Sequence, residues 1–161
     1  MAGSSPGTTW ERINLPNGDL SASQLRYLFG DSASHAWSTG ATSALSDYVV
    51  GITPASPAYR TWQVKPFPQE LQWAQGQVPS VGGTIAARWE LGDDVFRLTV
   101  TGPDATSGSV AVPTLGSARV IYCDGVQVWD GTAAVNGATA AATADGYVAF
   151  SGVTGSHTWA W

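Results

Sequence analysis

The sequence predicts a mainly β protein, an antiparallel β-sandwich of about eight strands that follows a short helical segment. Hydrophobic residues make up 43% of the 161 residues and charged residues 12%, and there are 19 glycines and nine prolines. This composition departs from that of a helical bundle and is typical of many short strands joined by turns. After Pro57, apolar and polar residues alternate between turn residues at the short spacing of a sandwich.

A helix is expected near Ser34–Val50, because apolar residues there recur at steps of three and four, the spacing of one helical face. Asp31, Ser32 or Ser34 can cap its start, and Gly51 with the prolines beyond it would end it. The face consists of Trp37, Ala41, Leu45, Tyr48, Val49 and Ile52. This apolar face is expected to pack against the sandwich or against a second copy of the chain.

Period-two alternation and turn residues predict the strands, eight or nine in all. Glu90–Leu98, with Gly-Asp-Asp near its centre, is expected to form a hairpin. The low-complexity tract Gly131–Gly146 is rich in alanine but also in Gly and Thr, and it predicts a loop with at most one weak strand. The expected strands lie within Tyr59–Pro66, Leu71–Pro79, Gly83–Leu91, Val95–Gly102, Ser109–Pro113, Ala118–Gly125, Val126–Gly131, Gly146–Val153 and Gly155–Trp161.

Three segments follow from these patterns. Residues 1–9 contain little to bury and are expected to be a flexible lead, residues 10–56 form the helical segment, and residues 57–161 form the sandwich.

Charge and cysteine content exclude several classes of protein. The net charge is −5 and the seven basic residues are scattered, which argues against nucleic-acid binding. No apolar run approaches the ~20 residues of a membrane span, and the first residues lack the pattern of a signal peptide. Cys123 is the only cysteine, so it is expected to be an unreactive packed thiol. No metal or cofactor is predicted, because the Asp residues of Gly92–Asp94 and of Asp124–Gly125 are better explained as hairpin turns than as calcium ligands.

The eight tryptophans suggest two roles, core packing and sugar stacking. Trp62, Trp73 and Trp89 alternate with polar residues, so at least two of them are expected in the core. Trp129, Trp159 and Trp161 lie at strand ends and are the better candidates for exposure.

Three stretches, Thr8–Arg12, Ser34–Ile52 and Val64–Glu90, resemble in order and spacing the C-terminal portion of bacterial and fungal alpha-L-rhamnosidases, glycoside hydrolase family 78. The resemblance weakens after Val112. It implies that residues 10–56 match the last hairpin of a six-hairpin (α/α) barrel, and that residues 57–161 match the β-sandwich that follows the barrel. It also implies an extracellular protein.

The resemblance further implies roles for four residues. Glu11 matches the carboxylate that activates water as general base, while His35, Trp10 and Trp37 match residues that line the rhamnose pocket. From the residues alone, Glu11 is better explained as a solvated carboxylate or a partner of Arg12. His35 is as readily a surface residue at a helix start as a ligand of a sugar hydroxyl.

Inverting hydrolysis needs a general acid as well as a general base. In the family the acid lies upstream in the barrel, so this chain is expected to have negligible rhamnosidase activity alone. Three hypotheses remain: a rhamnosidase C-terminal region without an intact catalytic site, a carbohydrate-binding or host-interacting sandwich derived from it, and an enzyme completed by another chain. The expected partners are a rhamnose-containing glycan or glycoside and, through the helix face, a second copy of the chain.

Overall fold

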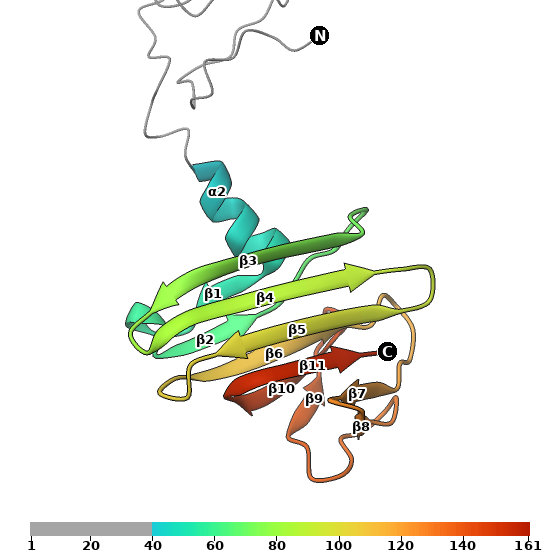
Figure 1. Cartoon of the computed structure of the whole chain (residues 1–161). Coiled ribbons are helices and arrows are strands. Elements are labelled where there is room, and N and C mark those ends of the chain that lie inside the picture. Colours follow the sequence, from blue (N-terminus) through green and yellow to red (C-terminus); the bar gives the residue numbers. More distant parts are fainter. Residues whose placement is uncertain (1–39) are drawn as a thin grey trace, which may run out of the picture. The chain divides into compact units, whose positions relative to one another are not determined.

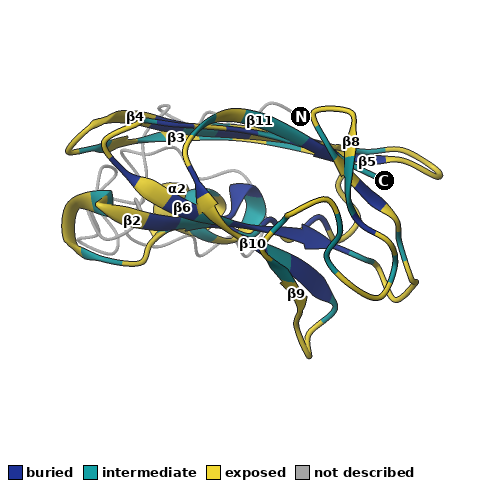
Figure 2. Ribbon diagram, turned by 90° about the horizontal axis from the view of Figure 1, so that it is seen from below, coloured by how far each residue is buried: buried dark blue, intermediate teal, exposed yellow. Residues whose placement is uncertain are grey.

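The computed structural model describes residues 40–161 of the chain. Helix α2, Gly40–Ala44, closes one compact unit, and Leu45–Trp161 form a second. The second unit is a sandwich of two β-sheets (Figures 1 and 2), preceded by the π-helix η2, Leu45–Val50.

One sheet has five strands in the order β1-β2-β6-β10-β9, and the other has six in the order β3-β4-β5-β11-β7-β8. All pairings are antiparallel except that of β2 with β6, which is parallel. The strands are β1 Ile52–Pro54, β2 Thr61–Val64, β3 Trp73–Ser80, β4 Gly83–Leu91, β5 Phe96–Gly102, β6 Ser107–Pro113, β7 Ile121–Cys123, β8 Val126–Trp129, β9 Ala140–Ala142, β10 Tyr147–Val153 and β11 Gly155–Ala160, and the 3₁₀ turn η3, Pro57–Tyr59, lies between β1 and β2.

The predicted mainly β sandwich is confirmed, with eleven strands in the described residues. The additional strands include β1 and β9, which have three residues each and are too short to show a period. The predicted hairpin is β4 and β5, in which Glu90 faces Arg97, and the alanine-rich tract contains β9 as its one strand. The division of the chain into segments 1–9, 10–56 and 57–161 stays a prediction. Strand β1 lies before residue 57, in the part of the chain expected to be helical.

The helix predicted near Ser34–Val50 is helical from Gly40, where the description begins, to Val50. Gly51 follows with a positive φ of 86°, and its N–H donates to the Ser46 carbonyl at 2.9 Å. This bond spans five residues, as π turns do, so steps of three and four no longer mark a single face. Accordingly, Val50 is buried and Val49 packs against the core, whereas Leu45 is 57% exposed and Tyr48 69% exposed.

The sandwich therefore covers only part of the predicted helix face. We expect Leu45→Asp to change the free energy of unfolding by no more than about 0.5 kcal/mol, since Leu45 is a surface position. Val50→Asp places a charge in the core and should lower the free energy of unfolding by about 3 kcal/mol or more. Urea denaturation followed by circular dichroism measures both. Equal losses for the two variants would contradict this assignment of faces. Association of two copies through Leu45 and Tyr48 stays a prediction.

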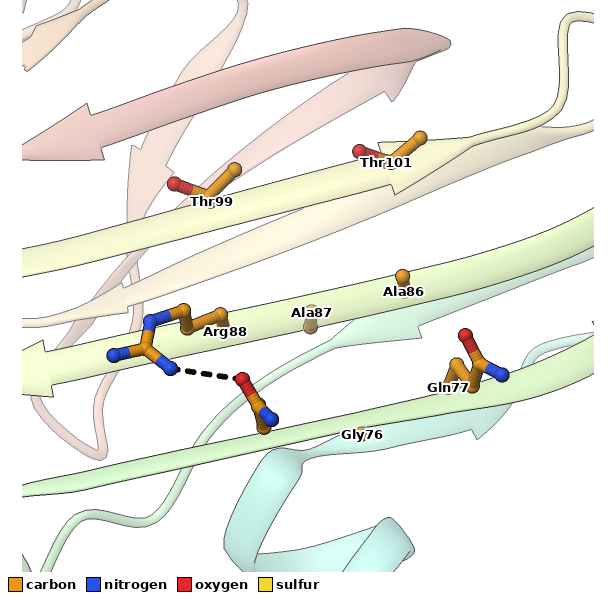
Figure 3. A pocket seen from close by; sticks show the side chains of 8 residues that line it. Gly76, Gln77, Ala86, Ala87, Arg88, Thr99 and Thr101 are labelled. Atoms are coloured by element: carbon orange, nitrogen blue, oxygen red, sulfur yellow. Dashed lines mark hydrogen bonds between the residues drawn. The ribbon is translucent and has the colours of Figure 1, made fainter.

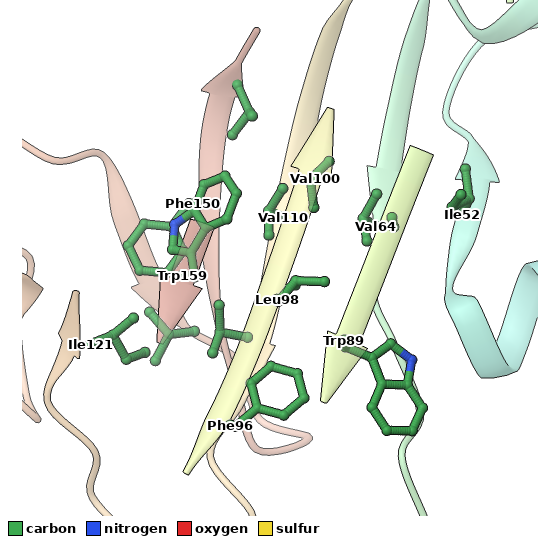
Figure 4. Packing of buried hydrophobic residues seen from close by; sticks show 14 of the residues in the cluster. Ile52, Val64, Trp89, Phe96, Leu98, Val100, Val110, Ile121, Phe150 and Trp159 are labelled. Carbon is green, nitrogen blue, oxygen red and sulfur yellow. The ribbon is translucent and has the colours of Figure 1, made fainter. Parts of the chain in front are cut away.

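The core lies between the two sheets (Figure 4). Trp62 and Trp89 are 1% and 0% exposed, which confirms two of the predicted core tryptophans. The indole N–H of Trp89 donates to the Val49 carbonyl at 2.8 Å, so strand β4 holds the end of η2. Phe96 stacks between Trp89 and Trp161, with ring centroids 6.4 and 5.9 Å apart.

The expectation that Trp129, Trp159 and Trp161 are exposed is wrong. Trp129 and Trp159 are buried, at 5% and 3%, and Trp161 is half-buried. Trp129 ends β8 and Trp159 lies in β11, both in the six-stranded sheet, and Trp161 follows β11. Trp159 packs on Phe150 of β10, in the five-stranded sheet, with ring centroids 6.1 Å apart.

Candidate functional site

The outer face of the six-stranded sheet carries a continuous set of polar and aromatic side chains. Directly paired residues of neighbouring strands point to the same side of a sheet, so the strand registers define rows across this face. One row, the Trp73–Tyr122 row, crosses β3, β4, β5, β11 and β7 and consists of Trp73, Glu90, Arg97, Ala160 and Tyr122. Its two aromatic ends are open to solvent, with Trp73 56% and Tyr122 44% exposed.

The next row, the Arg88 row, is polar throughout and consists of Gln75, Arg88, Thr99 and Thr158. Arg88 is held in place by its neighbours. Its Nη1 donates to the Gln75 Oε1 at 2.8 Å, and its Nε and Nη2 donate to the Glu90 Oε1 at 3.1 and 2.5 Å. The guanidinium also lies 5.4 Å from the centre of the Trp73 ring. Arg88 therefore joins the two rows and orients Trp73.

Three adjoining hollows lie along this face. The central hollow, about 380 Å³, is lined by Gln75, Gln77, Arg88, Thr99 and Thr101 (Figure 3). The Trp73 hollow, about 330 Å³, lies beside Trp73, Glu90 and Arg97. The Tyr122 hollow, about 540 Å³, lies beside Arg97, Tyr122 and Trp161. All three are shallow. The central and Trp73 hollows offer amide, guanidinium and hydroxyl or carboxylate groups beside apolar atoms, whereas the Tyr122 hollow is lined mainly by apolar and aromatic side chains, among them Val95 and Val120. Such a mixed lining can bind a sugar, whose ring has an apolar face and hydroxyl edges.

A second cluster, Cys123, Asp124 and His157, lies at the hairpin turn between β7 and β8. Asp124 and Gly125 form this turn with φ values of 50° and 83°, which confirms the prediction of a turn here. The Asp124 carboxylate lies 2.6 Å from the His157 Nδ1 and accepts the Thr158 N–H at 2.8 Å. The other ring nitrogen, Nε2, lies 2.9 Å from the Thr154 carbonyl. The carboxylate thus ties the turn to β11.

The pKa shifts of Asp124 and Cys123 indicate a structural role for this cluster and not nucleophilic catalysis. The hydrogen bond from His157 is the largest of the effects that hold the pKa of the Asp124 carboxyl below its usual range. Burial, with the neighbouring Asp124 carboxylate, raises the pKa of the Cys123 thiol to about 11. A nucleophile or a thiolate metal ligand needs a lowered thiol pKa, so Cys123 fits the unreactive thiol that the sequence predicts.

The three residues could offer one ligand atom each to a metal ion, and these atoms lie within 4.8 Å of one another. A histidine binds a metal through an unprotonated ring nitrogen. Here each nitrogen of His157 already faces an oxygen, that of the Asp124 carboxylate or of the Thr154 carbonyl, so a metal ion would have to displace one of these contacts. We interpret the cluster as a hydrogen-bonded brace of the turn.

The low pKa of Asp124 makes stability depend on pH. Its ionised form contributes stability that is fully present above the unfolded pKa of about 4 and is lost as the pH falls through the lower folded value. We expect Asp124→Asn to lower the free energy of unfolding at pH 7 by about 1 kcal/mol, the net scale of a lost hydrogen bond. The variant should then lose less stability than the wild type below pH 4. Urea denaturation at pH 7 and pH 3 measures this, with Asp93→Asn in the β4–β5 turn as control. A loss that is the same at both pH values would contradict the linkage.

The residues that the sequence analysis assigns to catalysis and rhamnose binding, Glu11, Trp10, His35 and Trp37, lie outside the described residues. Their roles stay predictions.

The sequence reasoning did not single out Trp73 as a site residue. A signal was present: Trp73, Gln75 and Gln77 alternate along one strand and share its face. Trp73 alternates with two glutamines along its strand and so lies on the polar face. Trp62 lies on the same face of its strand as Val64, and Trp89 lies on the same face as Ile85 and Ala87.

Helices that are long and apolar enough to span a membrane do not occur in residues 40–161.

Comparisons with known proteins show what the sandwich is similar to. Residues 51–121, from the start of the sheets to β7, match the family model described as the bacterial alpha-L-rhamnosidase C-terminal domain. No curated protein sequence matches the chain.

Solved structures with the same fold are alpha-L-rhamnosidases. The enzyme of Streptomyces avermitilis, solved with L-rhamnose, has a TM-score of 0.71 at 23% identity, over 96% of this chain and 14% of its own. That of Dictyoglumus thermophilum has a TM-score of 0.73 at 16% identity, over 95% of this chain and 16% of its own. That of Aspergillus terreus has a TM-score of 0.56 at 30% identity, over 68% of this chain and 12% of its own. The chain thus spans less than a fifth of these proteins. Residues 51–121 of its β-sandwich are similar to the C-terminal domain of bacterial alpha-L-rhamnosidases, and the solved structures share its fold.

Proposed function

We propose that this chain is the C-terminal region of a glycoside hydrolase family 78 alpha-L-rhamnosidase, and that it supports a catalytic domain without hydrolysing rhamnosides itself. The observation that carries the proposal is the match of residues 51–121 to the C-terminal domain model. The parent reaction is the inverting hydrolysis of terminal alpha-L-rhamnose, and the expected substrate is a rhamnose-containing glycan or glycoside outside the cell.

The chemistry of the described residues supports the absence of activity in this region. Inverting hydrolysis needs one carboxyl group that is protonated at the working pH and a second that is ionised. The hollows of the sheet face contain Glu90 and Asp124. Glu90 is engaged by Arg88, and the lowered pKa of Asp124 keeps that carboxyl ionised at neutral pH. Neither is placed to act as the general acid.

A chromogenic assay tests this proposal. The purified 161-residue chain is incubated with 4-nitrophenyl alpha-L-rhamnopyranoside, with the Streptomyces avermitilis enzyme as positive control. We expect nitrophenolate release at the level of the buffer blank. Release that rises in proportion to the concentration of the chain would overturn the proposal, and Glu11→Gln would then show whether the predicted general base is responsible.

A further inference from the structure

We propose that the outer face of the six-stranded sheet binds an extended saccharide chain, which lies across the strands along the Trp73–Tyr122 row. This inference goes beyond the proposed function, because it concerns binding without hydrolysis and holds whether or not the chain supports a catalytic domain.

The geometry of the row suits an extended ligand. Trp73 and Tyr122 stand at its ends and are separated by four strand-to-strand steps, or ~19 Å at the usual strand spacing. Both rings are about half exposed on the same face. An aromatic face packs on the apolar face of a sugar ring, so two such platforms at this spacing can hold separate sugar units of one oligosaccharide.

The groups between the platforms match sugar hydroxyls. Each hydroxyl both donates and accepts a hydrogen bond, and so does each amide and hydroxyl side chain beside the row. Gln75 and Gln77 offer their amides from β3, and Thr99 offers its hydroxyl from β5, where it also pairs with Thr158 at 3.1 Å. Arg97 reaches two of the hollows and makes no hydrogen bond or ion pair with the described residues, so its guanidinium is available to a ligand oxygen.

The charge and shape of the face disfavour other polymers. Arg88 and Arg97 are the cations of the two rows, and Glu90 pairs with Arg88. A nucleic acid would require several uncompensated cations along its phosphates. A protein partner usually buries an apolar core in its interface. The Gln75, Arg88, Glu90 and Thr99 side chains between the two platforms are polar, and apolar residues such as Val95 and Val120 line the hollow beside Tyr122. The hollows are also open troughs along the sheet rather than closed pockets for a small molecule.

Affinity gel electrophoresis tests the proposal. The full chain is run through native gels that contain hydroxyethylcellulose, galactomannan or polygalacturonate, beside a gel without polysaccharide. We expect at least one polysaccharide to slow the wild type, and retardation by polygalacturonate alone would identify an acidic saccharide bound by Arg97. Trp73→Ala should weaken the affinity on the order of tenfold, the effect of one lost aromatic contact, and Tyr122→Ala should weaken it as well.

The matched control is Tyr48→Ala, because Tyr48 is also an exposed aromatic residue but belongs to η2 and not to a strand of this face. It should bind like the wild type. Because Trp73 is more than half exposed, its variant should keep the wild-type melting temperature. The proposal is overturned if none of the three polysaccharides slows the chain, or if Trp73→Ala binds as tightly as Tyr48→Ala. Neither result bears on rhamnoside hydrolysis, which the chromogenic assay measures separately.

Discussion

Replacing Gly108 with alanine is expected to lower the free energy of unfolding by about 3 kcal/mol or more, at the upper end of the effects of overpacking. A Cβ at this position would lie 2.3 Å from the Cη2 and Cζ3 atoms of Trp62, and one at Gly102 would lie 2.3 Å from its Cζ2. The two glycines make room for the indole. Trp62 cannot move aside easily, because it is buried and its N–H donates to the Thr106 hydroxyl at 2.9 Å.

Urea denaturation followed by far-ultraviolet circular dichroism measures this effect. Gly92→Ala is the control, since the nearest atom to its added Cβ is 3.9 Å away, and it should stay within about 0.5 kcal/mol of the wild type. A double-mutant cycle gives a sharper test. In a Trp62→Leu background, the added methyl has space, so Gly108→Ala should be much less destabilising there. Additive losses would argue against the contact.

Gly51→Ala is the second substitution with a large expected effect, about 3 kcal/mol or more. Gly51 has a φ of 86°, and an added Cβ would lie 2.2 Å from the Lys65 carbonyl oxygen. The colliding atoms belong to the backbone. They are also fixed, because the Lys65 N–H donates to the Gly51 carbonyl at 2.9 Å. The substitution should separate the end of η2 from the segment that directly follows β2 and begins with Lys65.

Thermal and urea denaturation of Gly51→Ala and Gly116→Ala distinguish the two causes of this loss. Gly116 has a similar φ of 77° but no atom within 4 Å of an added Cβ, so its variant reports backbone strain alone, about 1 kcal/mol. If both variants lose the same stability, the steric contact with Lys65 contributes nothing.

The strands and the C-terminal end of the helical segment could be predicted from the sequence because each depends on local chemistry. Alternation along Gly83–Leu91 places Ile85, Ala87 and Trp89 in the core. Gly51 ends the helical segment because it alone tolerates the left-handed φ found there. Period-two patterning also predicts that at least two of Trp62, Trp73 and Trp89 are buried, and Trp62 and Trp89 are.

The sequence could not show which faces of the strands lie between the sheets at the C-terminal end. Trp159 ends a strand and looked accessible, but the burial of its ring depends on Phe150 of the opposite sheet. The exposed face of η2 also depends on a π turn, which no residue pattern marks. The outer face of the six-stranded sheet also could not be predicted. Its rows depend on the registers of five strands, and the sequence shows only the alternation of Trp73, Gln75 and Gln77 within β3.

Hydroxyl-radical footprinting of the tryptophans, with and without the polysaccharide that slows the chain, tests the central claim most directly: that the sheet turns Trp62 and Trp89 into the core and Trp73 onto a saccharide-binding face. The account predicts that Trp73 is oxidised much faster than Trp62 and Trp89 in the free chain, and that the polysaccharide slows the oxidation of Trp73. Oxidation of Trp62 or Trp89 at the rate of Trp73, or a rate at Trp73 that the bound polysaccharide leaves unchanged, would contradict it.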